Sequence, residues 1–489
     1  MKIFLKISLI LIFITTFLPA CNDEEFLENR YIGTVTDFSV ASQIESLVAG
    51  AYWLASGEIN NMDPRIFSRM INTLETDVAV PFTDAGAGHW SFGASSINNF
   101  YNRVGDLTAD GSLSSIWRSS YAVIFNCNKG IDVIENEEFD DPNNWETRLK
   151  GEFLFLRAWA YYQLSRVFVP PYEDSRLNEE YIPIRTKPTS GFADANKARG
   201  TMGEFYELMV SSLQEAIDML PEEPRDNDPD RYNFSRATKS AAEFMLARIA
   251  FEMQDWGLAE EMATAVIEDP KFDLSEEPIE AWNKNTFDRP REVIWYYQWI
   301  RGDGVAWQDN SAWKWPQPYQ SFNALGTNQT SGGTLEQGTN KMVALSYSFL
   351  NQVGWTNPAD TSETEEARND LRYQQLYYRF DPASATPGPG VNPEFLFGLE
   401  RPTVWINKFY RSIKGGTTNE PILRLPEMYL TRAIINFLGG NGASQDVDQA
   451  VSDINAIRER AGLDPVDAGT LTEDLIHQER LKEMAFEGD

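Results

Sequence analysis

The strongest pattern of apolar positions in the chain lies between residues 148 and 168, in the sequence RLKGEFLFLRAWAYYQLSRVF. Apolar side chains recur there at helical spacing and form two stripes on the helix surface rather than one. Gly151, Ala158 and Ser165 add a row of small side chains, seven residues apart, that would let another backbone approach closely. Pro170 follows, and proline cannot continue a helix. The pattern predicts a central helix that packs between neighbouring helices.

Weaker apolar periods predict further helices on both sides of the central one. The first of these helices begins at 36 or 37 and runs to 54, and the others cover residues 117–134, 202–220, 238–254 and 257–268. Thr201 and Glu204 have the spacing of a capping box, which would begin the helix at Met202. The apolar positions near the C-terminus, including Leu430 and Ile454, continue the plan on both sides of a glycine-rich turn at 439–442.

Three helix pairs place large and small side chains where tetratricopeptide repeats place them. The pairs lie at 156–220, 238–268 and 430–457, and the first is interrupted by a long insertion. Each copy is degenerate, but three copies in one chain favour a helical-repeat scaffold. The predicted fold is therefore mostly α, a tetratricopeptide-like scaffold.

Residues 272–420 have a different character, because Pro, Gly, Gln, Asn and Trp dominate and helical periodicity is poor. Only residues 341–353 predict a helix, and EVIWYYQW at 292–299 predicts one short buried strand. The stretch is too long to be one structureless loop. We interpret it as an irregular, loop-rich subdomain carried by the scaffold segments 21–271 and 421–489.

The N-terminus has the pattern of a secretory signal. Lys2 and Lys6 precede an apolar run, which ends in Leu18-Pro19-Ala20-Cys21. Residues 1–20 are predicted to be the signal, and Cys21 resembles the cysteine that is acylated in bacterial lipoproteins. The alternative is an ordinary signal peptide that meets a cysteine by chance, which the chain's total of two cysteines makes less favoured. No second apolar run approaches the roughly 20 residues of a membrane span, so a lipid anchor alone is expected to hold the chain at the membrane.

Charge and histidine content exclude several classes of function. The chain carries 42 basic and 73 acidic residues, a net charge of −31, which repels the phosphates of nucleic acids. Its two histidines, His89 and His477, cannot build a three-histidine metal site. No phosphate loop, zinc pattern or G-x-S-x-G motif occurs. We therefore expect no metal and no cofactor. Cys127 lies on an apolar helix stripe and is predicted to be a buried, inert thiol.

Tryptophan is the residue type that suggests a ligand. A sugar needs a flat apolar platform for its C–H face and polar neighbours for its hydroxyl groups, and Trp among Asn, Gln or Asp supplies both. Five of the 14 tryptophans are candidates for binding a glycan: Trp90, Trp282, Trp307, Trp313 and Trp315. The alternative for each is packing in the core, which we assign to Trp117, Trp159 and Trp256 and favour for Trp295 and Trp299.

Two other classes of function stay open at this point. A helical glycosidase would use two carboxylates roughly 5–10 Å apart, and 73 acidic residues allow such a pair, although no motif singles one out. A tetratricopeptide array can also act as an assembly scaffold that binds another protein on its concave face.

Several segments of this scaffold together resemble one known family. LRAWAYYQL at 156–164, TKSAAEFMLARIAFEMQDWGLAEEMA at 238–263, RLPEMYLTRA at 424–433 and ERLKEMAFEG at 479–488 resemble the SusD/RagB family. The resemblance implies a non-enzymatic lipoprotein of the outer membrane of Bacteroidetes, which binds a nutrient glycan and delivers it to a SusC-like TonB-dependent transporter. Some relatives handle peptides instead.

The resemblance also bears on the two ends of the chain. The acidic tract at 22–25 looks like the signal that sends such lipoproteins to the outer face of the outer membrane. The family's closing motif normally continues past a glycine such as Gly488, whereas this sequence stops at Asp489. We therefore expect a truncated C-terminus and incomplete packing of the last helix.

Overall fold

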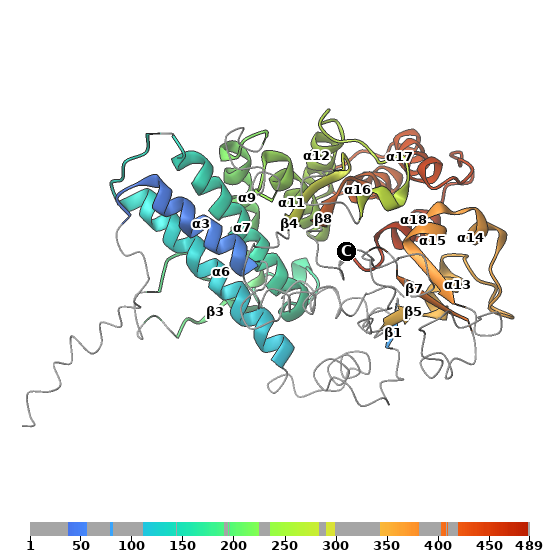
Figure 1. Ribbon diagram of the computed structural model, residues 1–489, viewed down its shortest axis with the longest axis horizontal. Helices are drawn as coiled ribbons and strands as arrows, with labels where there is room; N and C mark the ends of the chain where they lie inside the picture. The colour runs from blue at the N-terminus through green and yellow to red at the C-terminus, as the bar shows by residue number, and fades with distance from the viewer. Residues whose placement is uncertain are drawn as a thin grey trace, which may run out of the picture.

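The computed structural model describes most of the predicted scaffold and part of the irregular region. The described residues are 38–55, 79–81, 111–142, 144–189, 194, 196–223, 235–282, 290–298, 343–380, 402–406, 408 and 419–487. Helices dominate them, and the chain runs from one group of packed helices to a second group that carries short strands beside it (Figure 1). The predicted mostly α, repeat-like fold is confirmed.

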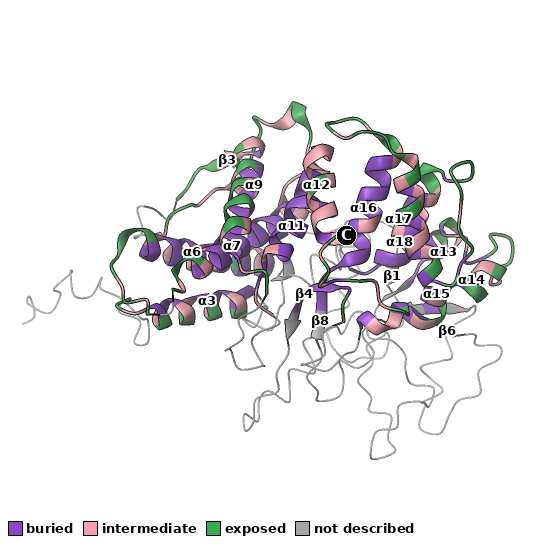
Figure 2. Ribbon diagram, turned by 90° about the horizontal axis from the view of Figure 1, so that it is seen from above, coloured by how far each residue is buried: buried purple, intermediate pink, exposed green. Residues whose placement is uncertain are grey.

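The central helix is α7, Glu146–Phe168, as the apolar pattern predicts. It packs against α6 (Gly111–Asn136) and α9 (Met202–Met219), while α3 (Ala41–Ala55) packs against both α6 and α7. Every residue of α7 from Gly151 to Ser165 is buried (Figure 2). A β-carbon on Gly151 would lie 3.0 Å from the Met219 side chain of α9, so the small side chain there permits the close approach that the sequence indicates.

Local sequence signals set the ends of these helices. At the start of α9 the Thr201 hydroxyl accepts from the Glu204 N–H at 3.2 Å, and the Glu204 carboxylate accepts from the Thr201 N–H at 2.9 Å. This confirms the predicted capping box. At the end of α7, Val169 is extended and its N–H still donates to Ser165 O, and two prolines follow. The helix stops because those prolines have no N–H to donate.

The C-terminal helices repeat the same arrangement. The helices are α11 (Lys239–Glu252), α12 (Trp256–Ile267), α16 (Leu425–Leu438), α17 (Val447–Arg460) and α18 (Glu473–Met484). The helix α11 packs on α12, α12 on α16, and α16 on both α17 and α18. These contacts are those expected of stacked helix pairs, in which each pair covers the apolar face of the next.

Short antiparallel pairs make up the strands of the described chain. They are β1 (Ala79–Pro81) with β5 (Val343–Leu345), β2 (Glu180–Pro183) with β3 (Arg199–Thr201), β4 (Val293–Gln298) with β8 (Asn419–Arg424), and β6 (Tyr377–Phe380) with β7 (Thr403–Ile406). The buried strand predicted at 292–299 is β4, and Trp295 within it is fully buried, as favoured from the sequence.

Two predicted helices have different limits in the structure. The helix expected at 341–353 is only Tyr347–Gln352 (α13), because Val343–Leu345 pairs with β1 and the Ser346 hydroxyl caps the helix at the Phe349 N–H. The helix expected from 36 or 37 begins at Ala41, because Val40 forms a bridge with Asp140. Both partners are distant in sequence, so the local period does not reveal them.

The irregular region holds more helix than its sequence predicts. The short helices α14 (Glu365–Asn369) and α15 (Leu371–Leu376) follow α13, and each begins at a residue whose side chain caps it, Thr364 and Asp370. Their core also includes Ile116 of α6 and Phe486 after α18, so it is not closed off from the scaffold. The domain limits 21–271, 272–420 and 421–489 stay a prediction.

The other tryptophans assigned to the core, and Cys127, differ in how deeply they are buried. Trp159 is buried in the main core, whereas Trp117 is half-buried at its margin and Trp256 is half-buried against the core of the C-terminal helices. Cys127 is fully buried, and burial raises the pKa of its thiol well above the usual value, as expected of an inert cysteine.

Within the part of the chain that the structure describes, no helix is long and apolar enough to cross a membrane.

Enlarging the small side chain at the centre of α7 should destabilise the protein. Ala158 is buried, so Ala158→Leu is expected to overpack the helix and lower the free energy of unfolding by about 1–3 kcal/mol. Ala49→Leu is the matched control, because Ala49 lies on the exposed face of α3. Denaturant unfolding of the two variants measures the difference. Equal midpoints would show that α7 does not need a small side chain at this position.

Candidate functional site

Most of the predicted site residues lie outside the described residues. This applies to the glycan candidates Trp90, Trp307, Trp313 and Trp315 and to the lipid-attachment candidate Cys21. Their assignment stays a prediction. Trp282 is the glycan candidate that the structure describes.

Trp282 does not present a platform to a ligand. Its side chain is only 2% exposed and belongs to the second hydrophobic core. The Arg424 guanidinium carbon lies 5.1 Å from its ring centroid and Lys408 Nζ lies 5.4 Å from it, which is cation–π distance. Because these cations cover the ring, a sugar cannot stack on it, and the prediction for Trp282 is wrong. Local sequence does not reveal that these cations cover the ring, since both come from more than 120 residues further along the chain.

The segments that carry the other candidates are attached to one strand pair. The segment that follows Pro81 contains Trp90, and the segment from 299 to 342, which precedes Val343, contains Trp307, Trp313 and Trp315. Pro81 and Val343 are register partners in the β1–β5 pair. The segment with Trp90 therefore begins, and segment 299–342 ends, at the same end of this strand pair.

Segment 299–342 begins directly after β4, which pairs with β8. Buried charges fix this strand pair. Arg424, the last residue of β8, donates from Nη1 to Glu292 Oε1 at 2.7 Å and from Nε to Glu487 Oε2 at 2.8 Å. Its Nη1 also lies 3.1 Å from Glu483 Oε1. Glu292 immediately precedes β4, and Glu483 lies in α18. One guanidinium thus joins β4, β8 and the last helix.

A buried lysine closes the turn that follows α18. Lys408 Nζ donates to Glu483 O and Ala485 O, both at 2.8 Å, and to Glu487 Oε1 at 2.6 Å. Burial lowers the pKa of Lys408, although the Glu487 carboxylate opposes that shift. The same turn contains Phe486, a non-glycine residue at φ +71°, and these contacts hold it in that left-handed conformation.

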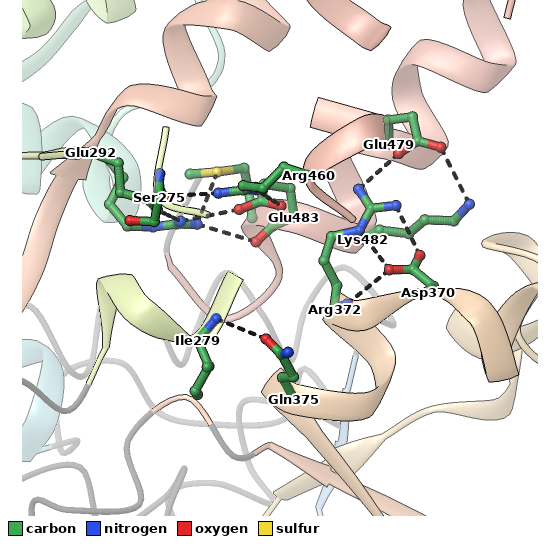
Figure 3. A network of polar contacts seen from close by, with 12 residues as sticks. Ser275, Ile279, Glu292, Asp370, Arg372, Gln375, Arg460, Glu479, Lys482 and Glu483 are labelled. Atoms are coloured by element: carbon green, nitrogen blue, oxygen red, sulfur yellow. Dashed lines mark hydrogen bonds and ion pairs between the residues drawn. The ribbon is translucent and has the colours of Figure 1, made fainter. Parts of the chain in front are cut away.

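A second group of buried charges joins α18 to α15 (Figure 3). Arg372 binds Asp370 through two parallel bonds, Nε–Oδ1 at 2.9 Å and Nη2–Oδ2 at 2.8 Å. Its Nη1 lies 2.7 Å from Glu479 Oε2, and Arg458 Nη1 lies 2.6 Å from Glu479 Oε1. Burial alone would raise the pKa of Glu479, but Arg372, Lys482 and Arg458 together lower it to about 2. We call the two groups together the buried charge cluster.

The buried charge cluster does not have the properties of a glycosidase site. A general acid needs a carboxyl group whose pKa is raised and that reaches the substrate. Glu483 and Glu479 are instead fully buried, and neighbouring arginines hold their pKa values below the usual range. The role that this geometry supports is structural, namely positioning β4, β8 and α18.

Neither a metal group nor a functional histidine is seen in the described ranges. No group of three or more His, Cys, Asp or Glu side chains there could hold a metal ion. His477 in α18 is 53% exposed beside Glu473, so it is a surface residue.

Two family models match adjacent parts of the chain. Residues 25–251 match a family described as starch-binding and associating with the outer membrane. Residues 273–489 match the SusD family. Together the two matches cover most of the first scaffold segment, the irregular region and the second scaffold segment, and leave out residues 252–272.

Curated relatives agree with the family matches. A SusD-like protein of Bacteroides ovatus is 23% identical over 317 residues, which are 61% of this chain and 51% of that protein. The SusD-like protein P25 of Formosa agariphila is 23% identical over 303 residues, 60% of this chain and 51% of that protein. The matches thus span about half the length of these relatives.

Solved structures share the fold at low sequence identity. A SusD superfamily protein from Bacteroides thetaiotaomicron has a TM-score of 0.68 at 22% identity, over 92% of this chain and 87% of that one. A SusD-like carbohydrate-binding protein from Bacteroides vulgatus has a TM-score of 0.67 at 18% identity, covering 92% and 82%. A laminarin-binding SusD-like protein has a TM-score of 0.65 at 16% identity, covering 92% and 90%. Family models, relatives and fold agree, and the chain belongs to the SusD/RagB family.

Proposed function

We propose that this protein captures oligo- or polysaccharide at the cell surface, without cleaving it, and delivers it to a SusC-like TonB-dependent transporter. The observation that carries the proposal is the β1–β5 pair, which attaches the two tryptophan-bearing segments at Pro81 and Val343. Several tryptophans in segments attached at one strand pair would suit a glycan chain, because each sugar ring offers one apolar face to stack.

The fixed strand pair at which segment 299–342 begins would favour binding. A ligand pays less ordering entropy when the elements that carry its contacts are already fixed. Here the Arg424 contacts join the β4–β8 pair to α18. The carboxylates that Arg424 contacts form ion pairs within the buried charge cluster. One matched family is described as starch-binding and one similar structure is a laminarin-binding protein, so starch and laminarin are the first ligands to try.

Loss of a stacking tryptophan should weaken glycan retention. Trp90→Ala, Trp313→Ala and Trp315→Ala are each expected to weaken binding about three- to tenfold, because one stacking contact contributes about 1 kcal/mol. Trp307→Ala extends the series. Calorimetry of the soluble chain without residues 1–21 against a glycan panel measures this.

The matched control is Trp53→Ala, because Trp53 is 48% exposed on α3 and is not a candidate. It should leave the affinity unchanged. If the candidate variants all bind like the parent, the assignment of the site is wrong. If the parent releases new reducing ends, it is a glycosidase, and if it binds only peptides, it is a peptide-binding member of the family.

The membrane attachment can be tested at one residue. Cys21 follows Leu18-Pro19-Ala20, so we expect it to be acylated and the protein to be displayed outside the outer membrane. Cys21→Ala should abolish fatty-acid labelling, and protease added to whole cells should digest the wild-type protein. Cys127→Ala is the control and should keep the label, because that thiol is buried. Labelling that survives in Cys21→Ala would refute the assignment.

Delivery to a transporter requires a stable encounter with that protein. A SusC-like transporter encoded next to this gene should co-purify with the wild-type chain after mild detergent extraction. A transporter that never co-purifies, from cells in which both proteins are present, would argue for capture without direct delivery.

A further inference from the structure

The turn between α16 and α17 contains the chain's one Asn-Gly dipeptide, Asn441-Gly442. Gly440 and Ala443 on either side exchange two backbone hydrogen bonds, both 2.9 Å long. Asn441 has φ +50° and Gly442 has φ +90°, so the two residues form the centre of a tight turn with both residues in left-handed conformations. Asn-Gly is the sequence that such turns prefer.

Both central residues of this turn are open to solvent. Asn441 and Gly442 are exposed, and the Gly442 N–H donates none of the hydrogen bonds found among the described residues. Glycine has no β-carbon, so nothing shields its nitrogen from the preceding side chain. The dipeptide therefore places a free backbone nitrogen next to an amide carbon that it can attack.

We propose that Asn441 is a site of spontaneous deamidation through a cyclic imide. The Gly442 nitrogen loses its proton to hydroxide and bonds to Asn441 Cγ. The bond from Cγ to the side-chain nitrogen then breaks, and that nitrogen leaves as ammonia after taking a proton from water. Water next opens one of the two imide carbonyls and gives aspartate or isoaspartate. The net change is amide plus water to carboxylic acid plus ammonia, with no oxidation or reduction.

The position of the turn gives this modification a structural consequence. Asn441 O accepts a hydrogen bond of 3.2 Å from the Gly257 N–H in the first turn of α12. A β-carbon on Gly257 would lie only 3.1 Å from Gly442 O, so the two backbones are already in close contact. Isoaspartate adds a methylene to the backbone of a turn with two central residues. The Gly440–Ala443 pair and the contact with Gly257 cannot both survive that change, so isoaspartate at this position loosens α12 from α16 and α17.

The test is to age the folded chain without residues 1–21 in neutral and alkaline buffer. Mass spectrometry of the tryptic peptide 433–458 then locates any amide-to-acid exchange. We expect exchange at Asn441 at least roughly tenfold faster than at Asn436 or Asn455 of the same peptide, because neither precedes glycine. Isoaspartate should be among the products, and the rate should rise with pH.

The matched variant is Asn441→Gly, which keeps the left-handed conformation and the backbone carbonyl that Gly257 needs. Its melting temperature should stay constant on ageing while that of the wild type falls. A folded chain that gains no acid at Asn441, while a synthetic peptide of residues 433–458 does so in the same buffer, would overturn the proposal. A wild type that is deamidated but melts like aged Asn441→Gly would overturn the structural consequence.

Discussion

Arg424→Met should lower the free energy of unfolding by about 3–5 kcal/mol, the cost of removing one partner from a buried ion pair. Arg424 is fully buried, and its guanidinium contacts Glu292, Glu483 and Glu487. Methionine fills much of the same volume but leaves these carboxylates without their main cation. Denaturant unfolding followed by circular dichroism measures the loss, and the slope with denaturant shows whether two-state unfolding persists.

The matched control is a second arginine that pairs with a carboxylate at the surface. Arg291 lies 3.4 Å from Asp273, and both side chains are 61% exposed. Arg291→Met should change the free energy of unfolding by no more than about 1 kcal/mol, because solvent screens an exposed pair. If Arg424→Met were as mild as this control, the buried charge cluster would contribute little to the fold.

Helices that follow from local signals were predictable, and elements that depend on distant partners were not. The apolar stripes of α7 and the Thr201–Glu204 capping box lie within one stretch of chain, so their sequence shows them. The strand β5 exists because residues 79–81, more than 260 positions earlier, pair with it. A helix prediction over 341–353 fails there because a local period cannot include that partner.

The buried charges show the same limitation more strongly. Glu479, Lys482 and Glu483 of α18 have the spacing of an ordinary solvated helix face, yet all three are buried. The cations that pair with the two glutamates come from positions such as Arg372 and Arg424, which a single sequence does not connect with them. The same reason explains the error at Trp282, whose aromatic face is covered by those distant cations.

The candidate site itself was only partly predictable. Residue type suggested a kind of ligand, because tryptophans among polar neighbours favour a sugar. Composition could not tell whether a candidate such as Trp313 is a platform or, like Trp282, a core residue, since both lie in segments rich in polar residues. What the structure adds is the β1–β5 pair, which links two candidate segments that lie far apart in the sequence.

Acid should unfold the protein through the same cluster, and Glu479→Gln should reduce that sensitivity. The folded pKa of Glu479 is about 2, because three cations outweigh the effect of its burial. A carboxyl group whose pKa is lowered by folding contributes stability above its unfolded pKa of about 4.3 and loses it as the pH falls towards the folded pKa. At one pKa unit per 1.36 kcal/mol, Glu479 contributes about 3 kcal/mol at neutral pH, and Glu483, whose pKa is also lowered, adds to it.

The measurement is the free energy of unfolding at a series of pH values for the wild type and two variants. Glu479→Gln should be less stable than the wild type at neutral pH, and the gap should close by about 2 kcal/mol between about pH 4.3 and pH 2, because only the wild type protonates Glu479 there. Glu261→Gln on the exposed side of α12 is the control and should follow the wild-type curve throughout. Parallel curves for the wild type and Glu479→Gln would show that this carboxylate does not link folding to protonation, and that Arg372 and Arg458 bind it no better in the folded chain than water does in the unfolded one.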